Sequence, residues 1–144
     1  IIQLDFAKWT TYEATKDRDK PILIIDTIGK LAEIYSYAEF AYVGGGMKKN
    51  RLHNTLEPAA YGIPVIIGKY FDRFREANYL VKKGGFTSIK SSFEFITVFD
   101  QFIYDKDLVE KVGKINSEYI LKSLGASKII IGEIENDLKI QLSN

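Results

Sequence analysis

The 144-residue chain contains no cysteine and a single histidine, His53. Without cysteine, a disulfide framework and a thiolate zinc site are excluded. Without a second histidine, a histidine-based metal site is excluded as well, and we predict neither a protein-bound metal nor a cofactor. A lone histidine is more often a hydrogen-bonded structural group than a catalytic one.

No charge of one sign dominates, because 20 Lys and Arg oppose 19 Asp and Glu, for a formal net charge of +1. This balance gives no global field for nucleic acid or an anionic membrane surface. No apolar run approaches the roughly 20 residues of a membrane span, and no signal peptide is visible. G-x-G-x-x-G, P-loop and triad-like patterns are also absent. We therefore expect a soluble globular domain that does not bind nucleic acid.

Short apolar runs alternate with amphipathic stretches over the first two thirds of the chain. The run Ile22-Leu23-Ile24-Ile25 predicts a strand buried on both faces, and Asp26 and Thr27 are expected to cap the helix that follows. From Ser91 onward the spacing predicts helices only. Further strands are expected at residues 1–4, 40–43, 64–67 and 86–89, and the last helix at 127–142.

This order predicts an α/β fold, with a Rossmann-like parallel sheet flanked by helices and a helical C-terminal segment. We expect residues 1–144 to form a single domain. The chain begins with Ile1 inside an expected strand, so we interpret it as a fragment of a longer protein. Ligands of parallel sheets bind beyond the carboxyl ends of the strands. The segments at those ends are residues 26–30, 44–54 and 68–75.

The segment Gly44-Gly45-Gly46 follows an expected strand. Three glycines allow a backbone to approach a ligand closely and to present N–H groups to an anion. Taken alone, a turn that needs positive φ is the more frequent explanation.

His53-Asn54-Thr55-Leu56-Glu57 follows a polar loop. Asn54 is expected to be the N-cap of a short helix, with Glu57 in capping-box position. The start of a helix attracts anions, and a carboxylate one turn into the helix can accept hydrogen bonds from a ribose diol. A purely structural capping role is at least as frequent for such a pattern.

Positive charges cluster in two further places, in the loop Met47–Leu52 and at Lys69, Arg73 and Arg75. They suit contact with a phosphate or a sugar carboxylate. A solvated basic surface is the default alternative.

The order and spacing of these motifs are more specific than any one of them. The series Asp26-Thr-Ile-Gly29, Tyr42-Val-Gly-Gly-Gly46, His53-Asn-Thr-Leu-Glu-Pro-Ala-Ala60 and Gly62-Ile-Pro-Val65 resembles the C-terminal domain of the 3-deoxy-D-manno-octulosonic acid (Kdo) transferases. The resemblance is densest over residues 22–89. It implies one half of a GT-B glycosyltransferase that binds the CMP part of CMP-Kdo.

The resemblance also implies the role of the whole protein. The family transfers Kdo from CMP-Kdo to a lipid A precursor during lipopolysaccharide biosynthesis, at the cytoplasmic face of the bacterial inner membrane. Its general base is a glutamate of the N-terminal domain, so no catalytic residue is expected in this chain, which alone should be inactive. Contact with the acceptor and the membrane is expected through that other domain.

Matched position by position, the resemblance assigns nucleotide contacts to seven residues and places four more near the phosphate or sugar. The first group is Ile28, Gly29, Lys30, Asn54, Thr55, Leu56 and Glu57, and the second is Gly44, Gly45, Gly46 and His53.

Two positions and one loop depart from the family pattern. Lys30 stands where the family usually has glutamate, and Gly46 stands where serine is frequent. The loop Met47–Leu52 replaces a glycine-rich approach to His53. Two other functions remain open. One is a GT-B domain for a UDP- or ADP-sugar, and the other is a non-catalytic flavodoxin-like binding module.

Overall fold

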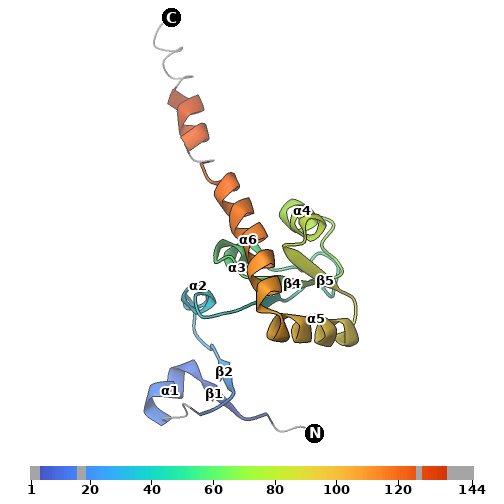
Figure 1. The fold of residues 1–144 in the computed structure, drawn as a ribbon. Coiled ribbons are helices and arrows are strands. Elements are labelled where there is room, and N and C mark those ends of the chain that lie inside the picture. Colours follow the sequence, from blue (N-terminus) through green and yellow to red (C-terminus); the bar gives the residue numbers. More distant parts are fainter. Residues whose placement is uncertain (1–3, 16–18, 126–127, 136–144) are drawn as a thin grey trace, which may run out of the picture. The chain divides into compact units, whose positions relative to one another are not determined.

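The computed structural model describes residues 4–15, 19–125 and 128–135, and the chain divides into two compact units, Ile1–Ala38 and Glu39–Asn144 (Figure 1). Each unit contains its own parallel sheet, where the sequence predicted one sheet. Most of the strand expected at residues 1–4 lies outside the described residues, and Leu4 itself is not in a strand.

The first unit contains strand β1 (Phe6–Lys8), helix α1 (Trp9–Thr15), strand β2 (Ile22–Ile24) and helix α2 (Leu31–Tyr35). β1 and β2 pair in parallel, with Lys8 beside Ile24. The prediction that β2 is buried on both faces is wrong, because all three of its residues are exposed. Within the described residues β2 pairs with β1 alone, so it is an edge strand and not the central strand of a covered sheet.

Asp26 caps a different helix from the one predicted. Its carboxylate accepts hydrogen bonds from the backbone N–H of Thr10 (3.1 Å) and from the Thr10 hydroxyl (2.8 Å). These bonds lower the pKa of Asp26. The register of β1 and β2 explains the partner, because α1 begins directly after Lys8 and Asp26 lies two residues beyond Ile24. Helix α2 instead begins after Lys30 without a side-chain cap.

The second unit alternates strands and helices before it ends in helices, as the sequence predicts. Its sheet has the order β3-β4-β5 and is entirely parallel. The elements are β3 (Ala41–Val43), α3 (Leu56–Ala60), β4 (Val65–Gly68), α4 (Arg75–Lys83), β5 (Phe86–Ile89), α5 (Ser92–Tyr104) and α6 (Lys106–Ser123).

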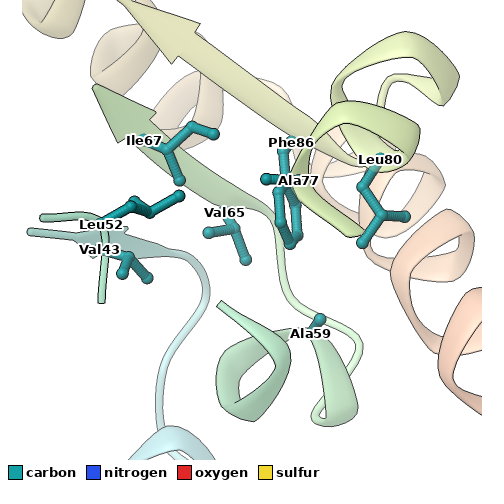
Figure 2. Packing of buried hydrophobic residues seen from close by; sticks show 8 residues of the cluster. All are labelled: Val43, Leu52, Ala59, Val65, Ile67, Ala77, Leu80 and Phe86. Atoms are coloured by element: carbon teal, nitrogen blue, oxygen red, sulfur yellow. The ribbon is translucent and has the colours of Figure 1, made fainter. Parts of the chain in front are cut away.

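The central strand β4 is buried along its whole length, as a continuous apolar run predicts. Val65 and Ile67 belong to a cluster that includes residues of α3 and α4, and Figure 2 shows this packing. Ile66 belongs to a second cluster, with residues of α5 and α6. The first cluster consists of Val43, Leu52, Ala59, Val65, Ile67, Ala77, Leu80 and Phe86.

Helix α6 is connected to the sheet through one fully buried polar side chain. The Asn116 amide donates hydrogen bonds to the carbonyl oxygens of Ile63 (2.8 Å) and Gly85 (2.9 Å), just ahead of β4 and β5. Because buried carbonyl groups need partners, Asn116 fixes the position of α6 relative to the amino ends of two strands.

The predicted C-terminal helix, residues 127–142, is confirmed over the part that the structure describes. Residues 128–135 are helical, so Ile129-Ile130-Ile131 belongs to a helix and not to a strand. The rest of the predicted helix, at residues 127 and 136–142, lies outside the described residues. None of the helices in the described residues combines the length and the hydrophobicity that a membrane span requires.

Candidate functional site

Two of the three predicted ligand-binding segments lie together at the carboxyl ends of β3 and β4. The Gly46 carbonyl oxygen accepts a hydrogen bond from the Tyr70 N–H (2.9 Å), which joins the loop after β3 to the loop after β4. The Gly44 carbonyl oxygen accepts a bond from the His53 N–H (3.1 Å). The glycine turn is therefore bonded to both neighbouring segments.

Close backbone packing requires glycine in this turn. Gly45 has a φ of 87°, and a Cβ atom there would collide with the Arg51 carbonyl group. A Cβ atom on Gly46 would lie 2.8 Å from the Gly68 backbone nitrogen. These contacts account for Gly45 and Gly46 without a ligand, and the positive φ of Gly45 agrees with the structural explanation that the sequence favoured. No such contact requires glycine at Gly44, where a Cβ atom would meet nothing within 4 Å. A role beside a bound phosphate stays a prediction.

Asn54 and Glu57 are both exposed, and their side chains contact each other. The Asn54 amide nitrogen donates to the Glu57 carboxylate (3.0 Å), and the Asn54 amide oxygen accepts from the Leu56 N–H (3.0 Å). The predicted capping box is wrong in detail. Thr55 is the N-cap of α3, and Glu57 bonds to the Asn54 side chain and not to a backbone N–H. The arrangement leaves a carboxylate in solvent with further capacity to accept hydrogen bonds.

Thr55 and Leu56 connect this pair to the core. Thr55 is buried, and its hydroxyl oxygen has no hydrogen-bond partner among the residues that the structure describes. A contact between Thr55 and a nucleotide would therefore be made by the Thr55 backbone. Leu56 is 38% exposed. Because α3 has only five residues, its dipole is small. The role of the Asn54 and Glu57 side chains in nucleotide binding stays a prediction.

The remaining predicted nucleotide contacts belong to the first unit. Ile28 is fully exposed, and Gly29 has a φ of 86°. The Lys30 ammonium group lies 2.9 Å from the Glu33 carboxylate and 5.8 Å from the centre of the Trp9 ring. The structure places Ile28, Gly29 and Lys30 only within the first unit. The predicted site residues that it brings together are the glycine turn and the Asn54 segment, both in the second unit.

The basic residues after β4 divide between two places. Arg73 lines a pocket with Lys49, whereas Arg75 begins α4. The sequence did not single out Asn50 and Tyr70, which line the same pocket. No group of three or more His, Asp or Glu side chains that could hold a metal ion occurs in the described part of the chain.

Comparison with known proteins gives a consistent result. The chain is 30% identical, over 122 residues, to the Kdo transferase of Aquifex aeolicus. This match covers 82% of the chain and 34% of the relative. It is 28% identical, over 126 residues, to the Kdo transferase of Haemophilus influenzae, covering 86% of the chain and 29% of the relative. The chain is homologous to the Kdo transferases. It spans about a third of the length of these two relatives.

Two further comparisons concern a solved domain and a second glycosyltransferase. The C-terminal CMP-Kdo binding domain of WaaA from Acinetobacter baumannii has the same fold, with a TM-score of 0.71 at 15% identity, over 81% of the chain and 61% of that domain's chain. A bifunctional glycosyltransferase/methyltransferase of Fusobacterium nucleatum is 28% identical over 94% of the chain and 22% of its own length. No protein-family model matches the chain. The predicted fold and the predicted resemblance are both confirmed.

Proposed function

We propose that this chain is the CMP-Kdo binding part of a Kdo transferase, and that the Asn54–Glu57 pair receives the ribose of CMP. The observation that carries the proposal is the position of the Glu57 carboxylate. It is exposed, held by Asn54, and directly follows the segment that bonds to the glycine turn through the His53 N–H. A carboxylate held in this way can accept hydrogen bonds from both hydroxyls of a ribose.

The Gly44–Gly46 turn would contact the phosphate in this arrangement. Negative charge develops on the departing CMP in the transition state. Backbone N–H groups that stabilise this charge would favour the transfer reaction. The turn of Ile28, Gly29 and Lys30 would complete the nucleotide contacts, through its backbone. Lys30 would contribute no side-chain contact while its ammonium group pairs with Glu33.

The remainder of the longer protein would supply what this chain lacks. A general base from the part of the relatives that the chain does not cover would deprotonate the acceptor hydroxyl. That part would also bind the lipid A precursor at the cytoplasmic face of the inner membrane. Closure of the cleft between the two halves would exclude water from the activated sugar. Residues 1–144 would act as one nucleotide-sugar binding domain in the complete enzyme, and the chain alone would transfer nothing.

A thermal-shift panel of nucleotides tests the proposal directly. We expect CMP to raise the melting temperature of the 144-residue chain at millimolar concentration, and UDP and ADP to raise it less. A bound ligand stabilises the folded state by mass action, so the shift should grow with concentration. A larger response to UDP or ADP would instead identify a GT-B domain for another nucleotide sugar. No response to any of the three would favour a binding module without nucleotide.

A further inference from the structure

A small pocket of about 270 Å³ lies beside the glycine turn, between the loop after β3 and the loop after β4. This volume is just below the roughly 300 Å³ at which sites for drug-sized ligands begin, so the pocket suits a single sugar residue. The residues that line it are Lys49, Asn50, Tyr70, Asp72, Arg73 and Phe74.

The wall formed by the loop after β4 is held in one conformation by the side chain of Asn78. Its amide nitrogen donates to the carbonyl oxygens of Phe71 (3.2 Å), Asp72 (2.9 Å) and Phe74 (2.8 Å). The Tyr70 N–H bonds to the Gly46 carbonyl oxygen at the other end of this loop. A loop fixed at both ends pre-organises the groups that it carries, which lowers the entropic cost of binding a ligand.

The charge in the pocket is predominantly positive. Lys49 and Arg73 both line it, and within residues 4–15, 19–125 and 128–135 neither cation has a carboxylate within 4.0 Å. Asp72 adds one carboxylate, which can accept hydrogen bonds from sugar hydroxyls. A guanidinium and an ammonium group together suit an oxyanion, since charge-assisted hydrogen bonds are the strong ones.

We propose that this pocket binds the carboxylate of the sugar acid in the donor, with Arg73 and Lys49 as its ligands and Asp72 as a hydroxyl acceptor. The inference rests on the proposed function, because the donor is then a nucleotide ester of an octulosonic acid. In such an ester the carboxyl group is attached to the anomeric carbon that also bears the phosphate. Two anion sites must therefore lie side by side, and the Gly46–Tyr70 hydrogen bond joins the two loops that would form them.

Amide chemical shifts of the ¹⁵N-labelled 144-residue chain test the proposal with four separate probes: CMP, free Kdo, the methyl ester of Kdo and inorganic phosphate. We expect Kdo to shift the amides of Lys49, Asn50 and Arg73, and its methyl ester to bind at least tenfold more weakly because it lacks the charge. Inorganic phosphate should bind more weakly than Kdo. Equal binding of Kdo and its ester, or tighter binding of phosphate than of Kdo, would overturn the proposal.

Three variants locate the site. Arg73→Gln and Lys49→Gln should each weaken Kdo binding about tenfold, the usual loss for a charge-assisted hydrogen bond, and change CMP binding less than twofold. Arg75→Gln removes the same charge two residues away, at a residue that does not line the pocket. It should change neither Kdo binding nor CMP binding. Lys49 lies in an exposed loop, so its variant remains informative if the Arg73 variant unfolds. Unchanged Kdo binding in the Lys49 variant would exclude the pocket.

The CMP probe separates this inference from the function on which it rests. If CMP binds and Kdo does not, the carboxylate site is wrong and the nucleotide site stands. If neither binds, the proposed function is wrong as well.

Discussion

The side-chain amide of Asn54 donates a 3.0 Å hydrogen bond to the carboxylate of Glu57, and both residues are exposed at the start of α3. The same Asn54 side chain accepts a bond from the Leu56 N–H, so its orientation is fixed from two directions. A carboxylate held in solvent by a fixed neighbour is ready to receive hydroxyl groups. The proposed function depends on this relationship.

Replacement of Thr55 by valine should not destabilise the chain, although Thr55 is the N-cap of α3. Its buried hydroxyl oxygen makes no hydrogen bond, and an unpaired buried polar group costs about 1–3 kcal/mol. We expect the free energy of unfolding, measured with urea, to rise by up to about 1 kcal/mol. CMP binding should be retained, because the side chain does not reach solvent. A loss of about 1 kcal/mol, the usual effect of removing an N-cap, would show that the hydroxyl has a partner.

Replacement of Gly46 by serine should destabilise this chain. The new Cβ atom would lie 2.8 Å from the Gly68 backbone nitrogen and 3.2 Å from the Leu52 side chain. Backbone must move to relieve such a contact, and overpacking of this kind costs about 1–3 kcal/mol. Urea unfolding measures the loss, and Gly132→Ser, at a helical position with open space around it, is the control. A Gly46 variant as stable as the control would contradict the observed loop packing.

Replacement of Thr10 by valine should raise the pKa of Asp26 toward its ordinary value. The Thr10 hydroxyl is the largest cause of the lowered pKa, followed by the Thr10 backbone N–H. Because the pKa is lower in the folded state, the contribution of Asp26 to stability is present above its unfolded pKa and is lost as the pH falls through its folded pKa. Carboxyl ¹³C shifts followed against pH measure the change. An unchanged Asp26 titration in the variant would show that the Thr10 hydroxyl does not bond to this carboxylate.

The sequence predicted the elements that local patterns determine. β4 is a continuous apolar run and α4 an amphipathic stretch that ends at Gly84, whose φ is 83°. In both cases the pattern of burial follows from the residues themselves. The sequence also placed the glycine turn and the Asn54 segment at the correct edge of the sheet.

The features that were missed depend on contacts between segments. Asp26 bonds to Thr10 because of the register between β1 and β2, which no local pattern contains. β1 and α1 themselves were not predicted. The pocket between Lys49 and Arg73 forms only when two loops, about 20 residues apart in the chain, are joined by the Gly46–Tyr70 hydrogen bond. One local signal for the pocket was present in the sequence. Asparagine tolerates positive φ, so Asn50 indicated a turn in the basic loop, and its φ is 60° in the structure.

The most direct test of the account is the calorimetric affinity of the 144-residue chain for CMP, compared between the unchanged chain and Glu57→Ala. Glu110→Ala, which removes an exposed carboxylate from α6, is the matched control. We predict that the unchanged chain and the control bind CMP alike, and that the Glu57 variant binds it more weakly by about 1–3 kcal/mol, the cost of removing one partner from a set of hydrogen bonds. Equal CMP affinity in all three proteins, or no binding by the unchanged chain at millimolar CMP, would contradict the account.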